Sequence, residues 1–184
     1  MLKEIEERSF KDFKILEVGC GAGKILQEIV SELKPRVTVG LDISRAMARI
    51  TRKNMLKSGK YSSVYLIVAD AHKMPIREGC FDLLVSTGTL HHIKRPDELF
   101  KECSRVLKKN GEAWIYEFSY DADCKGFSKR LRRPSFLLKV LAALHGLPRS
   151  TFEKGYIKEA LEKSHCKNSI NYEEVVTKPV LYKI

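Results

Sequence analysis

The stretch Ile15-Leu16-Glu17-Val18-Gly19-Cys20-Gly21-Ala22-Gly23 decides the fold of this 184-residue chain. An apolar run typical of a buried strand leads directly into three alternating glycines, and a helical pattern follows them. Glycines let the backbone adopt positive φ, and they remove the side chains that would hold a ligand away from the main chain. The stretch therefore predicts a ligand-binding turn between a strand and a helix.

The spacing around this turn disfavours two familiar nucleotide loops. The dinucleotide fingerprint needs a small residue where Lys24 stands, and a phosphate P-loop needs Ser or Thr where Ile25 stands. Glu17, two residues before the first glycine, adds a carboxylate at the strand end. A carboxylate suits a cationic amino-acid group better than a pyrophosphate.

Two further strands are predicted to end in acidic residues. Val37–Leu41 leads into Asp42, and the run 64–69 leads into Asp70, while Ser44 is placed to cap the helix after the second strand. The alternation of strands and helices predicts an α/β fold with a parallel sheet. Because ligands bind at the carboxyl edge of such sheets, the two carboxylates and the glycine turn are expected at one site.

With these motifs in this order, the chain resembles the class I S-adenosylmethionine-dependent methyltransferases, in the small-molecule branch that includes quinone-biosynthesis enzymes. The resemblance covers roughly residues 15–117, and it includes Met74-Pro75 and the run Phe81–Ser86 that leads to Leu90-His91-His92. It implies a three-layer Rossmann-like fold with a mostly parallel seven-stranded sheet. The last strand, Val180–Ile184, would run antiparallel beside Ser169–Val176.

The resemblance also implies the cofactor, S-adenosyl-L-methionine, and how it is held. The glycine turn would pack against its amino-acid part, Asp42 would bind both ribose hydroxyls, and Ile43 would cover the adenine. Asp70 would accept a hydrogen bond from the adenine amino group. The expected cofactor-binding residues are Glu17, Gly19, Cys20, Gly21, Asp42, Ile43, Asp70, Ala71, His72, Ser86 and Thr87.

Two histidines just after the fourth strand, His91 and His92, are the candidates for a catalytic base, with a packing role as the alternative. Neither pattern of the nucleic-acid methylating enzymes of this fold is present. Ser86-Thr87-Gly88-Thr89 replaces the Asn/Asp-Pro-Pro-aromatic turn of amino-methylating enzymes, and no cysteine follows a proline as cytosine-carbon methylation requires.

Composition predicts a single cytoplasmic domain over residues 1–184. No apolar run is long enough for a membrane span, the amino terminus is too charged for a secretory signal, and five scattered cysteines without a Cys-x-x-Cys pair are expected to be reduced thiols, not metal ligands. The net charge of +11 fits either a solvated basic surface or binding to nucleic acid. Oligomeric state is left open.

An insert at about 120–150 interrupts the alternation of strands and helices with a basic run, Lys125–Arg133, and an apolar helix over 134–147. It is expected to cover the acceptor pocket, because it follows the fifth strand at the carboxyl edge. Three functions remain open. The first is methyl transfer to a small organic molecule, anionic or partly apolar. The second is RNA (tRNA) methylation through the basic run. The third is a cofactor-binding module without catalysis.

Overall fold

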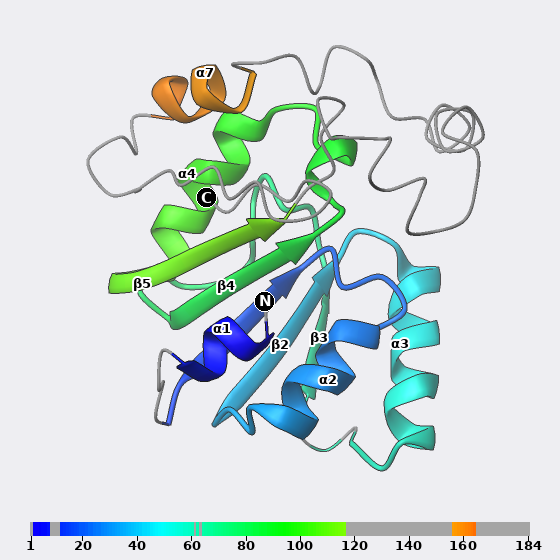
Figure 1. The fold of residues 1–184 in the computed structure, drawn as a ribbon. Coiled ribbons are helices and arrows are strands. Elements are labelled where there is room, and N and C mark those ends of the chain that lie inside the picture. Colours follow the sequence, from blue (N-terminus) through cyan, green and yellow to red (C-terminus); the bar gives the residue numbers. More distant parts are fainter. Residues whose placement is uncertain (1, 8–11, 61, 63, 117–155, 165–184) are drawn as a thin grey trace, which may run out of the picture. The chain divides into compact units, whose positions relative to one another are not determined.

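The computed structural model describes residues 2–7, 12–60, 62, 64–116 and 156–164 (Figure 1). The chain divides into two compact units. The first comprises residues 1–87 with 102–114, and the second comprises residues 88–101 with 115–184. The glycine turn belongs to the first unit.

Five strands form one sheet among the described residues. They are β1 (Lys14–Val18), β2 (Val37–Asp42), β3 (Val64–Val68), β4 (Phe81–Thr87) and β5 (Leu107–Tyr116). Their order is β3-β2-β1-β4-β5, and β1 pairs in parallel with both β2 and β4, while β2 pairs in parallel with β3. The predicted α/β fold is confirmed. The sixth and seventh strands, expected at 169–176 and 180–184, lie outside the described residues.

The strand register aligns the carboxyl ends of four strands. Val18 pairs with Leu41 on one side and with Ser86 on the other, and Asp42 pairs with Val68. Strand β1 is central and its side chains from Ile15 to Val18 are all buried, as its apolar sequence predicted. The chain therefore leaves β1, β2 and β3 at the same edge of the sheet.

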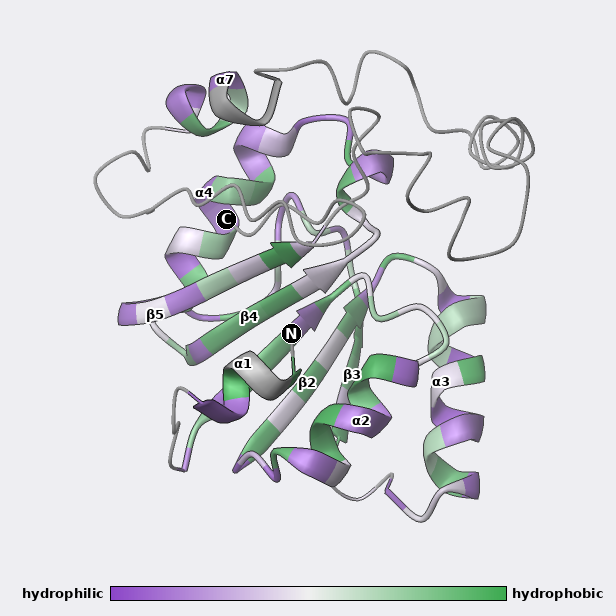
Figure 2. Cartoon of the chain, in the orientation of Figure 1, coloured by the Kyte–Doolittle hydropathy of each residue, from purple (hydrophilic) through white to green (hydrophobic). Residues whose placement is uncertain are grey.

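Helices α1 (Leu2–Glu7), α2 (Lys24–Glu32) and α3 (Arg45–Lys57) also belong to the first unit (Figure 1). Helix α2 contributes Leu26 and α3 contributes Met55 to one buried cluster with Cys20 and Val64, so both helices pack on the same face of the sheet. Hydrophobic segments are visible on both helices in Figure 2. Ser44 caps α3 as predicted, because its hydroxyl oxygen accepts a hydrogen bond from the Met47 amide.

Gly40 allows this close packing in the middle of β2. A Cβ at this position would lie 2.6 Å from Leu26 Cδ1, 3.0 Å from Cys20 Sγ and 3.1 Å from Leu66 Cδ2. Any side chain there would force these neighbouring side chains to shift. Glycine weakens a strand in general, and here it is required by the helix that packs directly over it.

Three elements differ from or add to the sequence predictions. Helix α1, with Ile5 fully buried, and helix α7 (Tyr156–Lys163) were not predicted. Strand β5 begins at Leu107 and runs through Asn110-Gly111, a dipeptide that favours a turn. A Cβ at Gly111 would lie 3.1 Å from the Lys108 nitrogen. Residues three apart in a straight strand are separated by about 10 Å, so the chain bends sharply within this range.

The remaining described elements are the short 3-10 helix η2 (Leu90–His92) and helix α4 (Pro96–Val106). Among the residues the structure describes, no helix is both long and apolar enough to cross a membrane. The insert at 120–150, including its basic run and apolar helix, lies outside the described residues.

Candidate functional site

The glycine turn after β1 is left-handed at every second residue. Gly19, Gly21 and Gly23 have φ of 74°, 51° and 76°. The amides of Gly19 and Cys20 both donate to the Leu41 carbonyl oxygen, at 2.8 and 3.1 Å, and the Gly23 amide donates to the Cys20 carbonyl at 2.8 Å. These amides are therefore engaged within the protein. The carbonyl oxygens of the turn, each with two lone pairs, are the groups suited to a ligand's hydrogen-bond donors.

Asp42, at the end of β2, connects the glycine turn to helix α3. Its Oδ2 accepts a hydrogen bond from the Gly21 amide at 2.8 Å, and its Oδ1 accepts one from the Ser44 amide at 2.8 Å. A carboxylate has about four lone-pair sites, so both oxygens keep capacity for hydroxyl donors. These two hydrogen bonds from backbone amides fix the orientation of the carboxylate before any ligand binds.

Helix α3 holds the turn from the other side through two residues that the sequence analysis missed. The Thr51 hydroxyl donates to the Gly21 carbonyl oxygen, and the Asn54 side-chain amide donates to the Ala22 carbonyl at 3.0 Å. Thr51 is fully buried. Polar residues on the inward face of the helix, beside Met55, were the available signal.

The Glu17 carboxyl group is buried behind the turn, with only 3% of the residue exposed. Its Oε2 has no hydrogen-bond partner among the residues that the structure describes. Burial, reinforced by the negative charge of Asp42, raises the pKa of Glu17 to about 8. Cys20 shares this environment, and burial together with Glu17 and Asp42 raises the pKa of its thiol to about 12, so it is an unreactive thiol.

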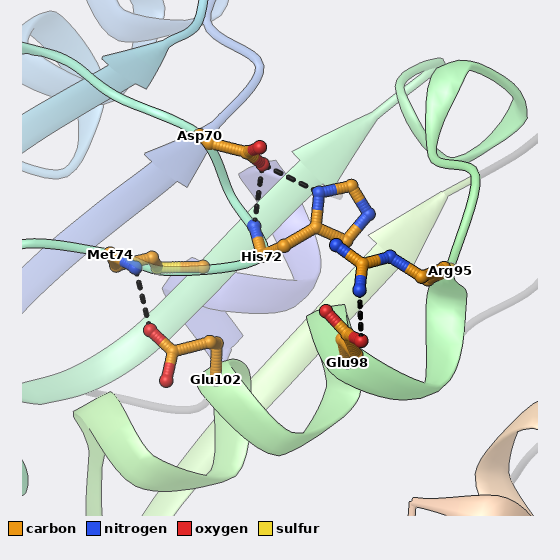
Figure 3. A network of polar contacts seen from close by, with 6 residues as sticks. All are labelled: Asp70, His72, Met74, Arg95, Glu98 and Glu102. Atoms are coloured by element: carbon orange, nitrogen blue, oxygen red, sulfur yellow. Dashed lines mark hydrogen bonds and ion pairs between the residues drawn. The ribbon is translucent and has the colours of Figure 1, made fainter.

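Asp70 follows β3 and forms a local pair with His72 (Figure 3). Its Oδ1 accepts from the His72 backbone amide at 2.8 Å and lies 2.5 Å from His72 Nδ1. Since a carboxylate only accepts, that ring nitrogen carries a hydrogen. The Ala69 amide donates to the Asp42 carbonyl at 3.1 Å, which joins the loop to the end of β2. Ala71, the expected backbone contact for adenine, is buried.

An ion pair on α4 fastens the segment that follows Asp70, and the sequence analysis did not find it. Glu102 Oε2 accepts from the Met74 amide at 2.6 Å, as Figure 3 shows. Arg105 donates through two nitrogens to both oxygens of Glu102, at 2.6 and 2.7 Å, and also to the carbonyls of Met74 and Ile76. The pair lowers the pKa of Glu102, with the Arg105 hydrogen bond as the main cause.

Three other predicted residues stand at the carboxyl edge in different environments. Ile43, next to Asp42, is 70% exposed. Ser86 is fully buried, and its hydroxyl donates to the Val18 carbonyl at 2.9 Å. The Ser86 side chain therefore ties β4 to β1. Thr87 ends β4 and is half-buried.

His91 and His92 belong to the second unit, in helix η2. Their ring centroids are 3.9 Å apart with the planes tilted by 52°. His92 is exposed and His91 is half-buried. Arg95 and Glu98, drawn in Figure 3, form an ion pair at the start of α4 in the same unit.

The first unit thus gathers three predicted carboxylates at the ends of β1, β2 and β3: Glu17, Asp42 and Asp70. Among the described residues, no group of three or more His, Cys, Asp or Glu side chains is arranged to hold a metal ion. The described part of the site combines hydrogen-bond acceptors with the exposed apolar side chain of Ile43.

Comparison with known proteins matches this arrangement. A protein-family model described as a methyltransferase domain matches residues 16–115. The malonyl-[acyl-carrier protein] O-methyltransferase of Geobacter sulfurreducens is 33% identical over 136 residues, which cover 74% of this chain and 46% of the relative. The ubiquinone biosynthesis O-methyltransferase of Thiobacillus denitrificans is 28% identical over 128 residues, covering 70% and 53%. The chain spans about half the length of these curated relatives.

Solved structures share the fold. A SAM-dependent methyltransferase from Aquifex aeolicus superposes with a TM-score of 0.71 at 19% identity, covering 98% of this chain and 87% of that one. The geranyl diphosphate C-methyltransferase of Streptomyces coelicolor A3(2) gives a TM-score of 0.67 at 16% identity, covering 89% and 58%. The family model covers more than half of the chain, including the glycine turn and the acidic strand ends, and the chain therefore belongs to the methyltransferase-domain family.

Proposed function

We propose that this chain is an S-adenosyl-L-methionine-dependent methyltransferase that acts in the cytoplasm on a small organic molecule. One observation carries the proposal. Three neighbouring parallel strands bring carboxyl groups to one edge of the sheet beside a left-handed glycine turn: Glu17 lies near the end of β1, Asp42 ends β2 and Asp70 follows β3. The cofactor offers donors of matching kinds, namely a cationic amino group, two ribose hydroxyls and an adenine amino group.

The residues present fit this group. Glu17 Oε2 is a buried acceptor without a partner among the described residues, and it lies behind the turn where the amino-acid part would bind. Asp42 is already oriented and retains lone pairs for the ribose hydroxyls. The exposed side chain of Ile43 would be covered by the adenine ring, while Asp70 and the Ala71 backbone would contact the edge of the ring.

The chemistry that the cofactor supplies is a methyl group on a positively charged sulfur. The chain's own contribution is to hold donor and acceptor in line and to exclude water, which can supply roughly 7 to 11 kcal/mol of the barrier. Gly19, Cys20 and Gly21 would position the amino-acid part, and the ends of β4 at Ser86 and Thr87 would lie beneath the sulfur. An acceptor that carries a proton also needs a base, and we assign that role to His91 or His92.

Two relatives support a small-molecule acceptor, because one is named a malonyl-[acyl-carrier protein] O-methyltransferase and the other a ubiquinone biosynthesis O-methyltransferase. We therefore favour an acceptor with a carboxylate or hydroxyl oxygen. RNA methylation would depend on the basic run Lys125–Arg133, which lies outside the described residues. A cofactor-binding module without catalysis would bind the methyl donor and transfer nothing.

The first test is calorimetric titration of S-adenosyl-L-methionine and S-adenosyl-L-homocysteine into the purified chain. Both should bind, and Asp42→Ala should weaken both by about ten- to a hundredfold, since hydrogen bonds to a charged acceptor contribute about 1.5 to 3 kcal/mol. Glu32→Gln, which changes an exposed carboxylate on α2, is the control and should bind like wild type. Binding of NAD without binding of the methyl donor would overturn the assignment.

The second test identifies the acceptor. Methyl-labelled cofactor is incubated with the chain and with separate pools of carboxylates, phenols, quinone precursors and RNA, and transferred label is measured. Label in a small-molecule pool supports the proposal. Label in RNA alone establishes the second function, and donor binding without transfer to any pool favours the binding module.

A further inference from the structure

All large apolar side chains that are well exposed among the described residues lie between residues 43 and 68. They are Ile43, Met47, Ile50, Leu56, Tyr65 and Val68. The same segment contains six Lys or Arg residues and neither Asp nor Glu. Where exposed apolar side chains of a soluble protein share one surface, that surface usually binds something.

Helix α3 carries the densest part of this surface. Residues 46, 49, 50, 53, 56 and 57 recur at the spacing of one helix face, and all six are exposed. We call them the α3 outer face: Ala46, Arg49, Ile50, Lys53, Leu56 and Lys57. Figure 2 shows hydrophilic and hydrophobic segments alternating along this helix. The inward positions Thr51 and Met55 are fully buried, so the outer face is not needed for packing.

Among the described residues, the cations of this face have no acidic partner. Within the described residues, no carboxylate lies in salt-bridge range of Arg49, Lys53 or Lys57, whereas basic residues elsewhere, such as Arg36 and Lys108, form such pairs. Helix α3 has five basic residues and no acidic ones. Beside these cations, Ile50 is 42% exposed and Leu56 is 56% exposed. Cations combined with exposed apolar side chains suit binding to an anionic surface with an apolar interior.

We propose that the α3 outer face docks the protein on anionic lipid bilayers. Its cations contact the phosphate headgroups, and Ile50 and Leu56 enter the boundary between headgroups and acyl chains. The attachment is peripheral and reversible. It is independent of the methyl-transfer function, because none of these six residues is assigned to the cofactor site.

Two other occupants fit the charges and side chains less well. A second copy of the chain would bring like charges together, which opposes self-association through this face. Single-stranded RNA binds through stacking on aromatic side chains, and the α3 outer face has none. Aliphatic side chains among the cations contribute to lipid binding and add little to contact with phosphates of RNA.

The test is cosedimentation of the full chain with vesicles. Phosphatidylcholine vesicles with about a third phosphatidylglycerol should bind the chain, and pure phosphatidylcholine vesicles should bind it weakly. The triple variant Arg49→Gln, Lys53→Gln, Lys57→Gln should lower partitioning by about 100-fold, since each basic side chain near an anionic surface contributes about fivefold. Ile50→Ser with Leu56→Ser should lower it by about tenfold at unchanged charge.

The matched control removes three exposed cations elsewhere: Arg77→Gln, Lys94→Gln, Lys109→Gln. It has the same net charge as the α3 triple variant and should bind vesicles like wild type. Circular dichroism melting confirms that each variant folds. Equal losses of vesicle binding in both triple variants would show that net charge alone causes the binding. Undiminished binding of the α3 triple variant would place the membrane-binding surface on another segment. Either result overturns the proposal, as does binding of a single-stranded RNA through α3 with no vesicle binding.

Discussion

The side chain of Thr51 occupies the space that any side chain at Gly23 would need. A Cβ at Gly23 would lie 2.5 Å from Thr51 Cγ2, while a Cβ at Gly21 would meet nothing within 4 Å. Both glycines have positive φ, at 76° and 51°. A residue other than glycine would therefore be strained at both positions, but its side chain has room only at position 21. The helix that holds the turn by a hydrogen bond to Gly21 also restricts Gly23 sterically.

This difference predicts distinct costs for alanine. Gly21→Ala should lower the free energy of unfolding by about 1 to 2 kcal/mol, the cost of a left-handed non-glycine residue. Gly23→Ala should cost more, because the Thr51 methyl group must also move. Thr51→Ser removes that methyl group and keeps the hydroxyl, so it should recover part of the loss in the double variant. Urea denaturation of wild type, Gly23→Ala, Thr51→Ser and the double variant measures the coupling between the two positions. Strictly additive losses of stability would contradict the contact.

Glu17 should make stability depend on pH in the unusual direction for a carboxylic acid. Its pKa in the folded protein is raised to about 8, above its ordinary value of 4.5. The folded state therefore holds a proton that the unfolded state releases between these values. The resulting stability is complete below about pH 4.5 and is lost as the pH rises through about 8, with a slope of at most about 1.4 kcal/mol per pH unit.

The measurement is urea denaturation of wild type and Glu17→Gln at several pH values between 5 and 8. The variant resembles the protonated acid, so its stability should lack this contribution to the slope. Glu32→Gln, at an exposed position, is the control and should follow wild type. Parallel pH profiles for wild type and Glu17→Gln would show that Glu17 titrates normally.

The same buried acid also predicts that binding a cationic ligand group releases a proton near neutral pH. Calorimetry in buffers of different ionisation enthalpy detects this release.

Sequence reasoning found what periodicity and turn chemistry encode locally. The buried run of β1, the glycine turn, the acidic ends of β2 and β3 and the Ser44 cap are each visible within a few residues. It missed the contacts of Thr51 and Asn54 with the turn, because these join residues about 30 positions apart. It also missed the Glu102–Arg105 pair, whose target, the segment at Met74, can be identified only once α4 is packed.

The Glu102–Arg105 pair should stabilise the segment after Asp70. Arg105→Met removes donors from the Met74 and Ile76 carbonyls and leaves Glu102 partly buried without its main partner. We expect a loss of roughly 1 to 3 kcal/mol in the free energy of unfolding at neutral pH. The Arg105 side chain is about a third exposed, which places the effect toward the lower end. Arg105→Lys should not rescue fully, since lysine cannot bind both oxygens in parallel.

Acid should narrow this difference. The pKa of Glu102 is lowered, chiefly by the Arg105 hydrogen bond, so the ion pair stabilises the protein above the ordinary carboxyl range and is lost as the pH falls through the lowered value. Wild type and Arg105→Met should therefore converge in stability as the pH is lowered below about 4. Lys101→Met, which removes a cation from a 4.0 Å surface pair on α4, is the control and should change stability little. A constant difference at every pH would assign the Arg105 effect to packing alone.

If one histidine of η2 acts as the base, its substitution should lower turnover, and substitution of the other should affect only packing. For His91→Asn and His92→Asn, we compare the rate of methyl transfer from S-adenosyl-L-methionine to the acceptor that the labelling screen identifies. Loss of a base should lower kcat and flatten its dependence on pH, while affinity for S-adenosyl-L-homocysteine stays within about a factor of two. His92 is exposed, so its substitution should leave the melting temperature unchanged, whereas His91 is half-buried and its substitution tests packing directly. A fully active double variant would exclude both from the chemistry, and a lower melting temperature with normal kcat per folded molecule would assign His91 to packing against its neighbour.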